Sequence, residues 1–196
     1  MINAVLVFNN NGQPRLTKFY TQLASRSIED TATQQTLLRQ IFDLVSARPS
    51  SACNFLPLPP LLAPAGVSSS PDAPTQITYR HYATLYFILI STSTESPLAL
   101  LDFIQVFVEA LDRLFENVCE LDLIFGFETM HAVLGEMIVG GVVIETSLEK
   151  IVAGVKESEG LKGKRRAVNA SSSSSLGKGS GFAGLGWPTG SGGSWR

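Results

Sequence analysis

Two histidines and two cysteines are the residues of this chain best suited to acid–base, nucleophilic or metal chemistry. His81 lies in a run with strand character and His131 in a run with helical periodicity, and the sequence places no nucleophile or carboxylate partner beside either. We interpret both as solvated or hydrogen-bonded structural histidines. Cys53 and Cys119 form no disulfide framework or metal-ligand spacing, and the apolar context of Cys119 predicts a buried thiol.

Two short motifs resemble binding signatures but lack the required context. The string from Gly179 to Gly184 matches the dinucleotide-binding pattern G-x-G-x-x-G, yet no strand precedes it and no helix follows. Lys164–Arg166 is a weak nuclear or membrane-surface signal that we interpret as a solvated basic linker. The sequence therefore predicts no catalytic residue, no metal and no cofactor, with an enzyme of unrecognised type as the remote alternative.

Charge is divided unevenly along the chain. Residues 160–196 hold six basic and no acidic residues, which leaves nine basic and 17 acidic residues before them, a net charge of −8. Such an acidic body argues against nucleic acid or an anionic membrane as a direct partner. Residues 1–8 carry no basic leader, and no apolar run approaches the roughly 20 residues needed to span a bilayer. We predict a cytosolic protein with reduced thiols.

The stretch Ile77–Ile90 carries the strongest strand signal, because it is rich in β-branched and aromatic residues and contains no glycine or proline. We predict one central strand, on which Ala83, Leu85 and Phe87 share a face. Before it, Ile2–Phe8 and a return strand around the Asn-Gly turn at Gly12 predict a β-hairpin.

Between the hairpin and the central strand, the pattern predicts a helix and a loop. Ser27–Ala47 has helical apolar spacing, with Ser27 as the candidate N-cap. Cys53–Leu56 is a candidate short edge strand. The proline-rich segment 49–74 is a long loop for a compact domain.

A long helix is predicted from Leu98 to Val118, starting at Ser96-Pro97. It is apolar around most of its circumference, and its acidic residues form a narrow polar strip. The sheet of the same domain can cover one side only. The remaining apolar surface therefore predicts a further helix or another protein against this helix.

After this helix, the sequence predicts an apolar connector over Glu120–Phe125 and a helix over Phe127–Val139 that the Gly140-Gly141 pair stops. A short helix capped by Thr146 or Ser147 follows. We predict one domain over residues 1–158, and a disordered Gly/Ser-rich basic tail over residues 159–196.

Four strings in order carry a family resemblance. The chain resembles the small (sigma) subunits of clathrin-adaptor-type complexes through MINAVLVFNNNGQPRLTKFY at its start, Tyr79–Phe87, Phe107–Leu111 and Phe115–Phe125. Within them, Arg80–Thr84 most resembles the sigma subunit of adaptor protein complex 3. The match extends to about Val155.

The resemblance implies an α+β, longin-like fold with a five-stranded, mainly antiparallel sheet flanked by helices. It also implies a heterotetramer with two large adaptin subunits and one medium (mu) subunit, in which a large subunit buries the excess apolar surface. The family role is protein transport from Golgi or endosomal membranes to the vacuole or lysosome. Membrane contact would be peripheral and would occur through the complex.

Small subunits of this family help to bind acidic dileucine sorting signals, [DE]xxxL[LI], in cargo tails. The family's pocket positions map onto Arg15, Ala83, Leu85, Val108, Asn117, Val118 and Leu123. The resemblance implies that the apolar side chains surround the leucines and that Arg15 contacts the acidic residue of the signal. Taken alone, the apolar positions are typical of a core and Arg15 of a strand surface.

Related proteins remain as alternatives. Another adaptor sigma subunit or coatomer zeta differs from the proposed assignment only in the exact residues of the motifs. A medium subunit needs a second large domain, and a longin SNARE needs a heptad segment; the chain has neither. The proline-rich loop looks longer than in most relatives, and the tail inherits no role from the family.

Overall fold

The computed structural model describes residues 1–20, 31–49, 51–59 and 74–160. Contacts group Met1–Glu157 into one compact unit, and Ser158–Arg196 form a second unit that falls almost entirely outside the described residues. The predicted cap Ser27, most of the proline-rich loop and the predicted tail beyond residue 160 therefore also lie outside the described residues.

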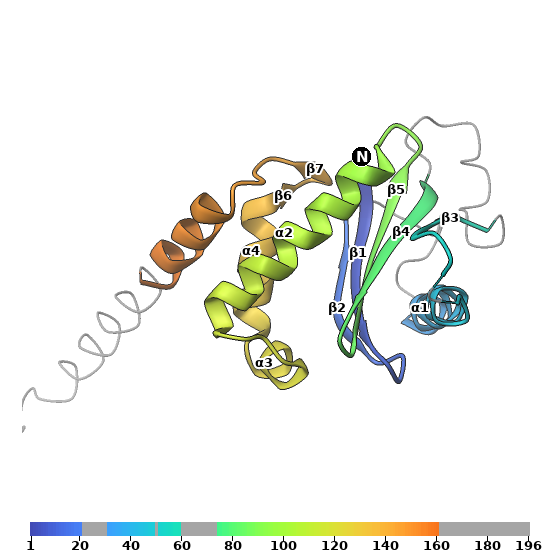
Figure 1. The fold of residues 1–196 in the computed structure, drawn as a ribbon, viewed down its shortest axis with the longest axis horizontal. Helices are drawn as coiled ribbons and strands as arrows, with labels where there is room; N and C mark the ends of the chain where they lie inside the picture. Colours follow the sequence, from blue (N-terminus) through green and yellow to red (C-terminus); the bar gives the residue numbers. More distant parts are fainter. Residues whose placement is uncertain (21–30, 50, 60–73, 161–196) are drawn as a thin grey trace, which may run out of the picture. The chain divides into compact units, whose positions relative to one another are not determined.

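A single five-stranded antiparallel sheet forms the centre of the unit (Figure 1). Its strands are β1 (Ile2–Asn9), β2 (Pro14–Phe19), β3 (Phe55–Pro57), β4 (Pro74–Tyr82) and β5 (Leu85–Thr92), in the spatial order β2-β1-β5-β4-β3. The sheet confirms the predicted α+β class, and β1 and β2 confirm the opening hairpin. The short edge strand predicted at Cys53–Leu56 is β3, which begins two residues later than predicted.

The prediction of one central strand over Ile77–Ile90 was wrong. The chain reverses at Ala83-Thr84, and β4 and β5 pair with each other from Tyr82 opposite Leu85 outward. Ala83 adopts a positive φ of 51°, a conformation usually left to Gly, Asn or Asp, so no residue type marked the turn. Ala83 is therefore exposed in a turn and does not share a strand face with Leu85.

Both faces of the central strands are buried, which explains their nearly continuous apolar sequence. Alternation along β1 sends Val5 and Val7 to one core and Leu6 and Phe8 to the other. Helix α1 (Thr31–Ser46) covers the second core, and it does so with the predicted stripe of Leu37, Leu38, Ile41, Phe42 and Val45.

Helices α2 (Pro97–Phe115) and α4 (Phe127–Met137) cover the opposite face (Figure 1). A final helix that begins at residue 148 adds Ile151, Val152 and Val155 to the same core. The predicted start at Ser96-Pro97 is confirmed, since Ser96 is the N-cap residue. The helix ends three residues before the predicted Val118, because Glu116 takes the left-handed conformation with a φ of 52°. Ser147 precedes the final helix as expected, and its carbonyl accepts the Ile151 N–H at 3.0 Å.

Two corrections concern the chain between these helices. The predicted connector is a helix, α3 (Glu120–Phe125), and α4 ends at Met137 rather than at Val139. Gly140 and Gly141 form the turn of a two-stranded hairpin, β6 (Ile138–Val139) and β7 (Val142–Val143), rather than a helix stop. A glycine pair suits both structures, because each needs positive φ values.

Candidate functional site

The turns of the two long hairpins meet at one end of the sheet. Asn9, the last residue of β1, pairs with Leu85, the first residue of β5, so the β1–β2 and β4–β5 turns are neighbours. A hydrogen bond of 3.2 Å between His81 Nε2 and Asn10 Oδ1 joins them. The C-terminus of α2 and the short helix α3 lie at the same end (Figure 1).

Arg15 projects from β2 at this end and already has an acidic partner. Its Nη2 and Nε lie 2.6 Å and 3.0 Å from Oε1 of Glu120, the first residue of α3. Gln13 Oε1 accepts a further bond from Nη2 at 3.0 Å. The resemblance implies that Arg15 contacts the acidic residue of a ligand, and in the folded chain Arg15 is already ion-paired with Glu120.

Glu120 is the residue that sequence reasoning missed. Its Oε1 also accepts a bond of 2.9 Å from Asn9 Nδ2, so it ties α3 to both β1 and β2. The bond from Arg15, and after it the bond from Asn9, lower the pKa of the Glu120 carboxyl below its usual value. The spacing of Cys119 and Asp122, a cap and its third helical residue, could have shown that a helix starts here.

A tight reversal between α2 and α3 presents Asn117 and Val118. Asn117 has a φ of 80°, which asparagine tolerates better than most residues. The Val118 N–H donates to Asp112 Oδ1 at 3.1 Å, and the Cys119 N–H donates to Asp122 Oδ2 at 2.8 Å. Side-chain carboxylates thus satisfy two backbone N–H groups between the helices.

The apolar members of the predicted site divide into two groups. Leu85 and Leu123 belong to the buried core beneath α2, with exposed fractions of 6% and 1%. Val108 and Val118 are half-buried and pack against that core. The valines, together with exposed Ala83 and Asn117, can therefore contact a ligand directly, whereas the two leucines support the surface from beneath.

The residues suited to catalysis do not assemble into a reactive group. His81 is exposed and lies 4.3 Å, centroid to centroid, from the Tyr86 ring. His131 is half-buried beside Phe127, and burial, followed by the charge of Lys18, lowers its pKa. Among the described residues, no group of His, Cys, Asp and Glu side chains could hold a metal ion. None of the described helices combines the length and the apolar composition that a membrane span requires.

The prediction of a buried Cys119 thiol was wrong. Both Cys119 and Cys53 are exposed. Cys119 is the N-cap of α3, and its side chain takes part in a capping box with Asp122. A cap residue lies outside the first helical turn, so the apolar neighbours of Cys119 in sequence do not enclose it.

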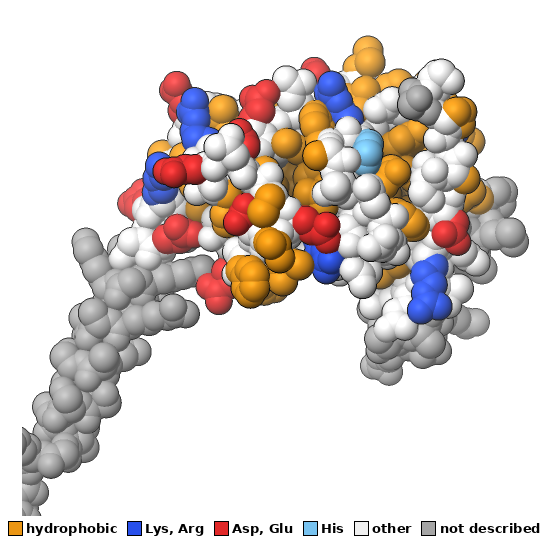
Figure 2. Space-filling view, turned by 60° about the horizontal axis from the view of Figure 1, so that its bottom comes forward, with side chains coloured by type: hydrophobic (Ala, Val, Ile, Leu, Met, Phe, Trp, Pro, Cys, Tyr) orange, Lys and Arg blue, Asp and Glu red, His pale blue; other side chains and the backbone are white. Residues whose placement is uncertain are grey.

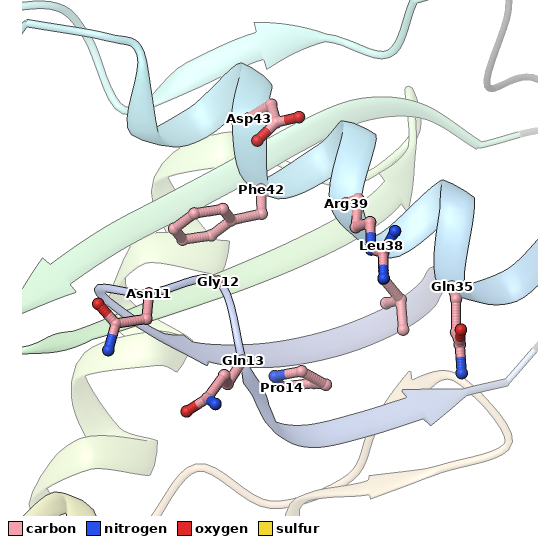
Figure 3. A pocket seen from close by; sticks show the side chains of 9 residues that line it. All are labelled: Asn11, Gly12, Gln13, Pro14, Gln35, Leu38, Arg39, Phe42 and Asp43. Atoms are coloured by element: carbon pink, nitrogen blue, oxygen red, sulfur yellow. The ribbon is translucent and has the colours of Figure 1, made fainter.

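A separate hollow of about 530 Å³ lies between the β1–β2 turn and α1 (Figure 3). The Phe42 ring points toward the turn, and a side-chain carbon added at Gly12 would come within 2.8 Å of it. This hollow includes none of the seven predicted site residues; its lining consists of Asn11, Gly12, Gln13, Pro14, Gln35, Leu38, Arg39, Phe42 and Asp43.

Next to Glu120, α3 and the start of α4 form an exposed apolar patch, defined by Leu121, Ile124, Phe125 and Phe127. Phe125 is 85% exposed and Leu121 61%. In Figure 2, hydrophobic side chains gather at the lower centre, where α3 comes forward. Large apolar groups gathered in this way are typical of a surface that a partner covers.

Comparisons with known proteins agree with this architecture. Residues 1–162 match the model of the clathrin adaptor complex small chain family. A clathrin-associated component of the AP-3 complex from Candida albicans is 45% identical, over 94% of this chain and 99% of its own. The AP-3 complex subunit sigma of Schizosaccharomyces pombe is 51% identical, over 78% of this chain and 82% of its own.

A structural comparison gives the same assignment. A chain in a homology model of the full-length AP-3 complex in a stretched open conformation superposes with a TM-score of 0.61 and 45% identity, over 85% of this chain and 98% of that one. Fold, sequence and length thus agree across nearly the whole described unit. The chain belongs to the clathrin adaptor complex small chain family.

Proposed function

We propose that this chain is the sigma subunit of an AP-3-type vesicle-coat adaptor complex and that it has no enzymatic activity of its own. In this role it binds two large adaptin subunits and one medium subunit. It stabilises the core of the complex and contributes part of the site for acidic dileucine signals. The complex acts peripherally on the cytoplasmic side of Golgi or endosomal membranes, in transport to the vacuole or lysosome.

The exposed apolar patch on α3 and α4 is the observation that carries the assembly role. Phe125 alone is 85% exposed, and Val139, Val142 and Ile144 add exposed fractions above one half nearby in the chain. If this chain is a small subunit of a larger complex, another subunit would pack against these exposed side chains. Burying them would contribute about 25 cal/mol for each Å² removed from water.

The cargo role is supported by the arrangement at the turn end of the sheet. Half-buried Val108 and Val118 pack against the core that contains Leu85 and Leu123, so they leave apolar surface for a leucine side chain. Arg15 lies at the same end, with an exposed side-chain fraction of 19%. A peptide with two leucines and an upstream acidic residue would need apolar and basic groups of these kinds.

Affinity purification of the tagged chain from native cells tests the assembly role. We expect two large subunits and one medium subunit in near-equal amounts. The identity of the large subunits distinguishes AP-3 from another adaptor or from coatomer, which is the alternative function. A chain recovered without stoichiometric partners would contradict the proposal.

The cargo role is tested in the assembled complex with a labelled acidic dileucine peptide. Val108→Asp should abolish binding without affecting assembly, because it places a carboxylate against the leucine side chains. Ala99→Asp introduces the same charge at an exposed position of the same helix and should leave binding unchanged. If Val108→Asp prevents assembly, Val108 belongs to the core or to a subunit interface.

Arg15→Ser should weaken binding of the same peptide by roughly threefold at low ionic strength, because a partly exposed ionic contact is lost. Lys18→Ser is the matched control, since it removes an exposed positive charge from the same strand. Equal affinity of wild type and Arg15→Ser would remove Arg15 from the site.

A further inference from the structure

We propose that Glu120 sets the specificity of the site for acidic ligands, because its carboxylate occupies the face of Arg15 that such a ligand would use. An acidic residue of the ligand must displace an internal carboxylate before it can bind. The inference rests on the proposed cargo role and concerns how strongly the acidic residue contributes to binding.

The geometry of the pair is the first support. Two of the guanidinium nitrogens of Arg15, Nε and Nη2, donate to the same oxygen of Glu120, at 3.0 Å and 2.6 Å. These two donors lie on one edge of the planar guanidinium, and such an edge matches the geometry of a carboxylate. A ligand carboxylate that approaches along this edge therefore finds the carboxylate of Glu120 already in the position where the ligand would bind.

Neighbouring groups hold Glu120 in this position. Asn9 Nδ2 donates to the same oxygen at 2.9 Å, and Gln13 Oε1 accepts from Arg15 Nη2 at 3.0 Å. Asn9 is itself fixed, because its side-chain oxygen accepts the Gln13 N–H at 2.8 Å. The competitor is thus preorganised by the β1–β2 turn, and its displacement loses several hydrogen bonds together.

Charge and exposure decide the consequence for a ligand. The formal charges of Arg15 and Glu120 cancel, so the pair offers an acidic ligand little net attraction until Glu120 leaves. Their exposed side-chain fractions of 19% and 30% leave both groups accessible enough for the exchange. The ligand's acidic residue should therefore add only modest affinity in the wild type, and more once Glu120 no longer competes.

The experiment measures the affinities of two labelled peptides for the full complex. One peptide carries glutamate upstream of its two leucines and the other carries glutamine at that position. Glu120→Gln should tighten binding of the acidic peptide by about fivefold, which is near the upper range for a partly exposed ion pair. The glutamine peptide should bind wild type and variant equally, which reports an intact leucine site.

Two further variants separate competition from general charge repulsion. Glu120→Asp keeps the negative charge, but its carboxylate is one methylene shorter and reaches Arg15 poorly. It should also tighten binding of the acidic peptide, by less than Glu120→Gln does. Glu128→Gln removes an exposed acid from the first turn of α4 and should change neither peptide.

Each outcome decides for or against the inference. If Glu120→Asp matches wild type, or if Glu120→Gln weakens binding of the acidic peptide, Glu120 does not compete for Arg15 and the inference fails. If wild type and all variants bind neither peptide, the cargo role fails and the inference fails with it. If wild type binds but the ratio of the two affinities stays the same in every variant, only the inference fails.

Discussion

The helices on the two faces of the sheet differ in how much apolar surface they leave exposed. Helix α1 covers one face, and none of its described side chains is a large hydrophobic group left exposed. The opposite face is covered by α2 and α4, and the final helix adds side chains to the larger core on that side. All the large hydrophobic side chains that are exposed in the described part of the chain belong to that side or to the segments that follow it: Leu98, Leu121, Ile124, Phe125, Phe127, Val139, Val142 and Ile144.

This difference separates a face whose apolar surface is buried within the chain from a face that leaves apolar surface exposed. The α1 face buries its apolar stripe within the chain. The α2–α4 face buries a deep core and still presents apolar side chains, so we expect partner contacts and the proposed ligand site on this side. Four predictions test this contrast, beginning with the largest expected effect.

The first prediction compares how much one aromatic ring in each core contributes to the free energy of unfolding. Phe107→Ala should lower the free energy of unfolding by about 3–5 kcal/mol, because Phe107 is fully buried against Phe87. Phe42→Ala removes a half-buried ring near Phe8 on the α1 face and should cost roughly half as much. Urea denaturation of the purified full chain measures both, and equal losses would contradict the contrast.

Adjacent glycines compare a crowded with an open position in the β6–β7 turn. An added side-chain carbon at Gly141, where φ is +83°, would lie 2.5 Å from the Ile2 carbonyl oxygen. We expect Gly141→Ala to cost about 3 kcal/mol through clash and backbone strain. Gly140 has a φ of +59° and open space around it. Gly140→Ala should therefore lower the free energy of unfolding by only roughly 1 kcal/mol. Similar melting temperatures for the two variants would show that β1 and this turn do not pack closely.

The exposed patch tests dependence on partners. Leu121→Ser with Phe125→Ser should lower recovery of the intact complex by about tenfold, which corresponds to the loss of roughly 1.4 kcal/mol of binding. The chain itself should unfold at the same urea concentration, because both side chains are already exposed. Gln35→Ser with Arg39→Ser, at exposed positions of α1, is the matched control. Normal assembly of the patch variant would mean that another surface binds the large subunits.

A smaller effect concerns pH. The pKa of His131 lies below its ordinary value of 6.5, first because of burial and then because of the charge of Lys18. The folded state therefore binds this proton less readily than the unfolded chain, and the stability that the neutral ring confers is complete above about pH 6.5. It should decline as the pH falls through the lower pKa of the folded state.

His131→Gln should remove this decline, and Lys18→Gln should reduce it in part. Melting temperatures between pH 7.5 and 5 measure the slope. A wild-type slope equal to that of His131→Gln would show that the half-buried ring does not resist protonation.

Patterns of local sequence predicted most of the elements. The Asn-Gly turn, the apolar stripe of α1 and the Ser96-Pro97 start of α2 are short-range signals, and the structure contains all three. The family resemblance added the five-stranded, mainly antiparallel sheet, whereas the order of hairpin, helix, strands and later helices came from the local patterns. The excess of apolar residues on α2 correctly indicated a side that the sheet alone does not cover, because a helix's circumference can be read from spacing.

Tertiary structure decided the remainder. Ala83 turns the chain without any turn residue, because β5 is held between β1 and β4 and the strands must reverse there. Leu85 and Leu123 are buried and Val108 and Val118 are half-buried, although all four have similar apolar side chains. Arg15 and Glu120 are 105 residues apart in the sequence, and only the fold brings their charges together. Local patterns determine which elements form, whereas burial and pairing depend on long-range contacts that no short stretch specifies.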